Sequence, residues 1–280
     1  MADYTPPEES TYVWFSHYDD IKNYPFYDAS GTLALILITY LVFVLYVGPS
    51  TMKDREGFKL KSILSIYNIL QVIISTYLTY LGLEILLETG VLPKACPIFD
   101  PKFRDKISYY TYTYFLAKVT ELLDTIFFVL RKKYKQVSFL HLYHHTSGII
   151  GSYILFRYSH SVTCLYFMTI NSMIHVIMYF YYFMSGLGPQ YAKYLSWKRH
   201  LTNLQRIQFI TVLLHQLYSL LRTKCEYTVI TIVYAVYSTI LYFIMFTNFY
   251  SSTYKKSARK NKDVLEINDE EVEAKETKSL

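Results

Sequence analysis

Residues 62–83 read SILSIYNILQVIISTYLTYLGL, a continuous stretch that contains no charged side chain. An α-helix rises about 1.5 Å per residue, so about 20 apolar residues suffice to cross roughly 30 Å of bilayer hydrocarbon. The stretch therefore predicts a transmembrane helix and makes a membrane protein the first hypothesis for the fold.

Six further stretches extend this prediction along the chain. Three of them also lack charged residues: Gly31–Gly48, Ser161–Leu187 and Tyr227–Tyr254. Three are long enough but more polar: Ile107–Leu130, Ser138–Phe156 and Leu201–Leu221. We predict an all-α integral membrane protein with seven transmembrane helices.

The composition supports a membrane protein over a soluble one. Of the 280 residues, 52% are hydrophobic and 18% are charged, whereas soluble domains average about 25% charged residues. The net charge of +6 does not indicate a nucleic-acid partner, because the Lys and Arg residues lie between the apolar stretches, as membrane flanks do.

The basic residues also predict the orientation of the spans. If the seven spans alternate, 18 of the 28 Lys and Arg residues fall on one side and eight on the other. The positive-inside rule places the richer side in the cytosol. We therefore expect a lumenal N-terminal segment (1–30), a membrane catalytic domain (31–254) and a disordered cytosolic tail (255–280).

The third predicted span holds charges that membrane helices normally avoid. Lys118, Glu121 and Asp124 are spaced three residues apart, with Thr125 beside them. Each charge costs about 2.5–3.5 kcal/mol at the centre of a bilayer on insertion scales. These side chains must therefore face the interior of the helix bundle.

Three other predicted spans carry polar groups at a similar depth. His141, His144 and His145 share one helix face, because helical neighbours are three and four residues apart. The other groups are Asn171, His175, Met178, Tyr179 and Tyr182 in the fifth span, and Gln205 and Gln208 in the sixth. Counted at about 1.5 Å per residue, all four sets fall in the cytosolic half of the bilayer. They predict one buried polar site that opens to the cytosol.

The histidine cluster is compatible with two chemistries. Neutral imidazoles bind metal ions. Alternatively, one histidine acts as a nucleophile or base while the others orient it. No cysteine of this chain falls near the predicted cytosolic face, which removes a thiolate nucleophile there.

Four motifs occur in order along the chain. They read KVTELLDT (118–125), HLYHH (141–145), NSMIHVIMYFYY (171–182) and TNLQRIQF (202–209). In this series the chain resembles the ELO family, the elongases of very long chain fatty acids. The resemblance implies a multi-pass 3-oxoacyl-CoA synthase of the endoplasmic reticulum, which condenses a long-chain acyl-CoA with malonyl-CoA and releases CoA and CO₂. It implies no cofactor or metal, and it implies partner reductase and dehydratase enzymes.

Roles for the histidines follow as hypotheses. His144 is expected to carry the acyl group as an acyl-imidazole, as the resemblance also suggests. His175 and His141 would position the thioester or stabilise the enolate, and His145 would be an orienting partner to Asp124 or Glu121.

Two further expectations concern residues outside the spans. The anionic CoA head is expected at Arg131, Lys132, Lys133, Lys135, Lys198 and Arg199, although positive-inside flanking explains each of them equally well. An oxidising lumen would also permit a disulfide between Cys96 and Cys225.

Two other classes of protein remain as alternatives. A di-iron desaturase or hydroxylase also uses HxxHH, but it needs about eight histidine ligands in several such boxes, and this chain has one box. A transporter or receptor could use intramembrane charges for coupling, but we find no internal repeat. The sequence leaves the acyl length and the formation of a homo-oligomer open.

Overall fold

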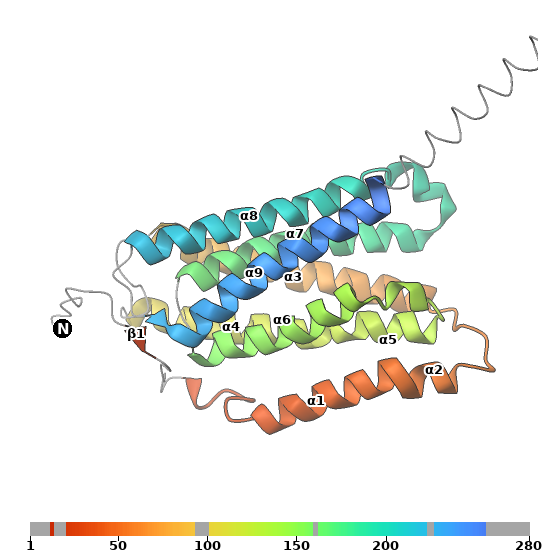
Figure 1. The fold of residues 1–280 in the computed structure, drawn as a ribbon, viewed down its shortest axis with the longest axis horizontal. Coiled ribbons are helices and arrows are strands. Elements are labelled where there is room, and N and C mark those ends of the chain that lie inside the picture. The colour runs from red at the N-terminus through yellow and green to blue at the C-terminus, as the bar shows by residue number, and fades with distance from the viewer. Residues whose placement is uncertain (1–11, 14–20, 93–100, 159–161, 223–226, 256–280) are drawn as a thin grey trace, which may run out of the picture.

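The computed structural model of the protein describes residues 12–13, 21–92, 101–158, 162–222 and 227–255. The regular secondary structure of these residues is helical apart from two short strands, β1 (Tyr12–Val13) and β2 (Tyr227–Thr228), which pair in parallel. The long helices lie side by side along the longest axis of the molecule (Figure 1). The predicted helical class is confirmed for this part of the chain.

The helical elements follow one another with short connections. In chain order they are α1 (Ser30–Val42), the π-helical turn η2 (Phe43–Val47), α2 (Gly48–Thr51), α3 (Lys61–Thr89), α4 (Pro101–Thr120), α5 (Leu122–Leu130), η4 (Tyr134–Gln136), α6 (Phe139–Tyr158), α7 (Val162–Leu187), η5 (Pro189–Tyr194), α8 (Lys198–Arg222), α9 (Val229–Tyr250) and η6 (Ser251–Lys255). Consecutive long helices run in opposite directions through the bundle (Figure 1).

Among the described residues, four helical stretches are long and apolar enough to cross a membrane. They are Ser30–Thr51, Lys61–Thr89, Thr163–Leu187 and Thr231–Tyr254. The other predicted spans are helical as well, over α4 with α5, over α6 and over α8, but they carry the polar motifs. The count of seven spans and the orientation of the termini therefore stay predictions.

The predicted single helix over residues 107–130 is wrong in one respect. The structure ends α4 at Thr120 and begins α5 at Leu122. The backbone N–H of Asp124 donates to the carbonyl oxygen of Glu121 at 3.2 Å, an i to i−3 bond that tightens the chain as in a 3₁₀ turn. The interruption lies where the side chain of Glu121 enters a buried ion pair, described below.

Helix α3 packs closely against α7, and among the described residues this helix pair makes the most extensive contact. Gly82 permits the approach, because a Cβ atom there would lie 2.1 Å from Oγ1 of Thr169 on α7. Small residues allow membrane helices to pack closely in the same way. A second apolar core joins α1 to α4, α5 and α6. Together these contacts hold α4 to α7 in the positions that create the site.

Candidate active site

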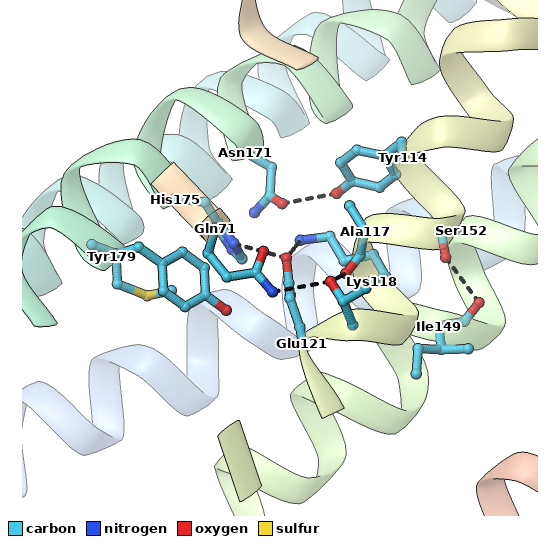
Figure 2. Close-up of polar contacts among 12 residues, drawn as sticks. Gln71, Tyr114, Ala117, Lys118, Glu121, Ile149, Ser152, Asn171, His175 and Tyr179 are labelled. Atoms are coloured by element: carbon cyan, nitrogen blue, oxygen red, sulfur yellow. Dashed lines mark hydrogen bonds and ion pairs between the residues drawn. The ribbon is translucent and has the colours of Figure 1, made fainter. Parts of the chain in front are cut away.

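A buried ion pair links α4 to α7. Nζ of Lys118 donates to Oε1 of Glu121 at 2.8 Å, and Nδ1 of His175 lies 3.0 Å from the same oxygen. The three side chains are between 4% and 8% exposed, and Figure 2 shows them converging from their two helices. Nδ1 of His175 has no hydrogen-bond partner of good geometry among the described residues. The carboxylate of Glu121 thus balances the charge of Lys118 and lies next to the imidazole of His175.

The histidine rings of α6 lie against one another beside this ion pair. The centroids of His141 and His145 are 4.3 Å apart, and those of His144 and His145 are 5.4 Å apart. The ring of His144 also lies 6.5 Å from that of His175 and 5.4 Å from that of Tyr242 on α9. His144 is therefore the histidine of the HLYHH motif that stands between α7 and α9.

A cavity of about 70 Å³ adjoins these groups. Lys118, Glu121, His144 and His145 line it together with residues of α4, α6, α7, α8 and α9. These further lining residues are Tyr114, Ser147, Gly148, Gly151, Ser152, Leu155, Thr163, Cys164, Phe167, Asn171, Phe209, Gln216, Tyr234, Ala235, Ser238, Thr239 and Tyr242. Leu155 lies eleven residues beyond His144 on α6, so the cavity extends roughly 16 Å along that helix.

Of the remaining predicted residues of the third and fifth spans, Asn171 lines the cavity and the others do not. Oδ1 of Asn171 accepts a hydrogen bond from Oη of Tyr114 at 2.8 Å. Oη of Tyr179 donates to Oδ2 of Asp124 at 2.7 Å, so a tyrosine rather than a cation is the partner of this carboxyl group. The side chain of Tyr182 is 40% exposed, and it does not line the cavity.

The predicted residues of the sixth span also lie off the cavity. Nε2 of Gln205 contacts Sδ of Met178 at 3.8 Å, which ties α8 to α7. Gln208 is buried, and its Nε2 has no hydrogen-bond partner among the described residues. Neither glutamine side chain lines the cavity.

The predicted CoA-binding residues do not line the cavity. Nζ of Lys132 donates to the carbonyl oxygens of Lys53 and Arg55, at 3.0 and 2.7 Å, which ties two connections together. Nε of Arg199 donates to Oη of Tyr250 at 2.6 Å. Lys198 begins α8, and the other three predicted residues follow α5: Arg131, Lys133 and Lys135. The end of α5 and the start of α8 lie at the same end of the bundle (Figure 1).

Two other predictions concern the cysteine pair and metal binding. Cys96 and Cys225 lie outside the described residues, as does the tail beyond Lys255. Within the described part of the chain, no three His, Cys, Asp or Glu side chains are grouped so that they could hold a metal ion.

Several tyrosines at the site were not predicted from the sequence. Tyr114 and Tyr242 line the cavity, and Oη of Tyr242 lies 2.7 Å from Oγ of Ser147. Both tyrosines fall within predicted spans, but 31 tyrosines in the chain leave no signal that singles them out.

A relay of hydroxyl groups leads from α1 to the histidine cluster. Oη of Tyr40 donates to Oγ1 of Thr125 at 2.6 Å, and this oxygen lies 2.9 Å from Nε2 of His141. A hydroxyl oxygen has two lone pairs and one proton, so Oγ1 of Thr125 can accept from Tyr40 and bond Nε2 of His141 at the same time. Tyr40 and Thr125 thus orient the ring of His141, which packs on His145.

We expect Tyr40→Phe to lower the turnover of this site about two- to tenfold, the range of a net contribution of one buried hydrogen bond. The effect should appear in kcat with little change in KM, because Tyr40 does not line the cavity. Tyr46→Phe is the matched control, since Tyr46 lies on the same helical stretch and is 71% exposed. Equal kcat for Tyr40→Phe and wild type would show that the relay is only structural.

The fold and the site define a multi-pass helical membrane protein with a buried, charged cavity. The chain belongs to the ELO family (GNS1/SUR4 family), whose profile matches residues 25–262.

Curated relatives resemble almost the whole chain. Very long chain fatty acid elongase 1 of Mus musculus is 36% identical over 260 residues, which cover 85% of this chain and 87% of that protein. Elongase 7 of Rattus norvegicus is 35% identical over 229 residues, or 80% of this chain and 81% of that protein. Elongase 4 of Homo sapiens is 35% identical over 243 residues, or 84% and 75%.

Proposed function

We propose that this protein catalyses the condensing step of fatty acid elongation, as a 3-oxoacyl-CoA synthase. Its membership of the ELO family and its similarity to proteins named very long chain fatty acid elongases support elongation as the process. The observation that carries the proposal is the cavity itself, which brings His144 together with Lys118 and Glu121 at the start of a long space between helices.

In the first half-reaction, an imidazole nitrogen of His144 attacks the thioester carbonyl of the acyl-CoA. The carbon–sulfur bond breaks, CoA leaves as a thiol after taking up the imidazole proton, and an acyl-imidazole remains. The side chains around His144 fit this role, because they are aromatic or uncharged on the α9 side: Tyr242 lies at 5.4 Å and Phe246 at 6.2 Å between ring centroids. The nucleophilic form of such a ring is the neutral imidazole.

In the second half-reaction, malonyl-CoA loses CO₂, and the electrons of the broken carbon–carbon bond form an enolate. The enolate attacks the acyl carbon, the carbon–nitrogen bond breaks, and the departing imidazolate takes up one proton from water, which restores His144. Lys118 is the buried cation of the site, so it would stabilise negative charge that develops on the thioester oxygen. Glu121 holds Lys118 in place for this step, and its carboxylate borders the ring of His175.

The setting follows from the same proposal. The protein would lie in the endoplasmic reticulum membrane with its basic connections in the cytosol. CoA would then rest at the end of the bundle that carries Arg131 and Lys198, and the acyl chain would extend along the cavity away from it. Reductase and dehydratase partners would complete the cycle.

The activity can be tested in microsomes that contain the expressed chain. Labelled malonyl-CoA is supplied with saturated and polyunsaturated acyl-CoAs of increasing length, and the products are identified by mass spectrometry. The proposal predicts 3-oxoacyl products, or their reduced forms, two carbons longer than the substrate. Microsomes from untransformed cells provide the background rate.

Two substitutions that narrow the cavity at different depths should shorten the accepted acyl chain to different extents. A Cβ atom at Gly148 meets nothing within 4 Å, and Gly148 lies one turn beyond His144. Ala235 lies seven residues before Tyr242 on α9, which corresponds to about 10 Å of depth. We expect Gly148→Leu to suppress extension of every long acyl-CoA at least about tenfold, and Ala235→Leu to suppress only the longest ones.

The product profile of each variant, measured with the full substrate panel, checks this order. Gly31→Leu is the matched control, because its Cβ atom also meets nothing within 4 Å but Gly31 does not line the cavity. If Ala235→Leu and Gly148→Leu gave the wild-type profile, the acyl chain would not occupy this cavity.

A further inference from the structure

The far part of the cavity is lined by a glutamine whose side-chain amide is not fully hydrogen-bonded. Gln216 of α8 lines the cavity, is 4% exposed, and lies seven residues beyond Phe209. Phe209 packs against Tyr242, with ring centroids 5.7 Å apart, so it marks the level of His144 on α8. Gln216 is therefore about 10 Å deeper, where the distal part of an acyl chain would lie.

The amide of Gln216 is only half satisfied. Its Nε2 donates to Oγ1 of Thr239 at 3.3 Å, and its Oε1 is buried without a hydrogen-bond partner among the described residues. A buried acceptor that lacks a donor is costly, and native proteins keep few of them. This oxygen is thus an unpaired buried acceptor on a residue that lines the cavity.

The neighbouring hydroxyl groups cannot supply that donor. Oγ of Ser152 donates to the carbonyl oxygen of Ile149 at 3.0 Å, and Oγ1 of Thr239 donates to that of Ala235 at 2.7 Å. Oγ of Ser238 likewise donates to the carbonyl oxygen of Tyr234. Each hydroxyl has one proton, and here that proton is engaged with the residue's own helix. These three hydroxyl groups therefore offer acceptors to the cavity, and their protons are already used.

We propose that the distal part of the cavity is a subsite for an acyl chain that carries a hydroxyl group near its far end. The hydroxyl proton would bond Oε1 of Gln216, and the acceptors on Ser152 and Thr239 would border the same group. This inference rests on the proposed condensing function and names a substrate class for it. An unsubstituted alkyl end would leave Oε1 unpaired, whereas in a purely apolar cavity the hydroxyl group itself would be unpaired.

The test is a competition between two acyl-CoAs of equal length, one with a terminal hydroxyl and one without. Microsomes that contain the full-length protein receive both, together with labelled malonyl-CoA, and mass spectrometry gives the ratio of the two elongated products. Because both substrates share one enzyme population, the ratio does not depend on expression. A series of lengths locates the distance at which the hydroxyl reaches Gln216.

At the best length, we expect the hydroxylated chain to be used at least as fast as the plain chain. Gln216→Leu should lower the product ratio at least about fivefold, because it removes the acceptor and keeps an apolar side chain of similar size. Leu217→Ala is the control, since Leu217 is 46% exposed on the same helix and does not line the cavity.

The outcomes separate the inference from the function on which it rests. A wild-type preference for the plain chain of more than about tenfold at every length would overturn the subsite, and so would a ratio that Gln216→Leu leaves unchanged. A water molecule held on Oε1 would give one of these results. Elongation of neither chain would instead contradict the proposed condensing function.

Discussion

His144→Ala is expected to abolish extension of acyl-CoA by malonyl-CoA, with a loss of at least about a thousandfold in kcat. Removal of a nucleophile in other acyl-transfer enzymes has effects of this order or larger. The ring of His144 is the one that lies between α7 and α9 on the cavity wall. Among the described residues, His145 also lines the cavity beside Lys118 and Glu121, but its ring packs on His141 and His144.

The same variant separates covalent catalysis from simple binding. After loading with acyl-CoA alone, digestion of the wild-type protein should yield a peptide containing residues 141–145 with the mass of one acyl group. The peptide from His144→Ala should carry none. His200→Ala is the control, because His200 lies in the first turn of α8 and does not line the cavity. An adduct that persists in His144→Ala would assign the acyl group to another residue.

Glu121→Gln has the second largest expected effect, on stability as well as on activity. The substitution leaves Lys118 as a buried cation without its carboxylate and removes the charge that faces His175. Breaking one partner of a buried ion pair costs about 3–5 kcal/mol, a large part of the 5–15 kcal/mol that stabilises typical native proteins. We expect a clearly lower melting temperature in detergent and loss of elongation.

A matched pair on the outside of the bundle provides the control. Glu84 accepts from Nζ of Lys106 at 2.7 Å, but these side chains are 34% and 38% exposed. Glu84→Gln should therefore cost less than about 1 kcal/mol. In the double variant Lys118→Met with Glu121→Gln, stability should partly return while activity stays lost, because no buried charge is left unpaired. Full activity of the double variant would show that the ion pair has no role in catalysis.

The sequence predicted which residues belong to the site better than it predicted which of them contact one another. Charged residues in a membrane helix must point inward, so the motif spacing alone brought Lys118 and Glu121 to the interior. Which side chains contact one another depends on how neighbouring helices are rotated about their axes. The sequence of a single segment does not determine that rotation. The structure therefore pairs Glu121 with His175, and Asp124 with Tyr179.

The contribution of α1 and α9 was not predictable for a related reason. Both helices are apolar nearly all round, so periodicity does not indicate which tyrosines turn inward. Tyr40 reaches Thr125, and Tyr242 reaches the cavity, only because of tertiary packing. The break at Glu121 was hidden in the same way, since residues 107–130 suit a continuous helix. The catalytic roles of the histidines stay predictions.

One measurement tests the central claim most directly. The purified wild-type chain, without reductase or dehydratase, is incubated with a long-chain acyl-CoA and malonyl-CoA labelled in its carboxyl carbon. The account predicts one labelled CO₂ released for each 3-oxoacyl-CoA formed, and neither product from His144→Ala. A folded wild-type protein that releases no CO₂ and forms no 3-oxoacyl-CoA with any acyl-CoA of the panel would contradict it.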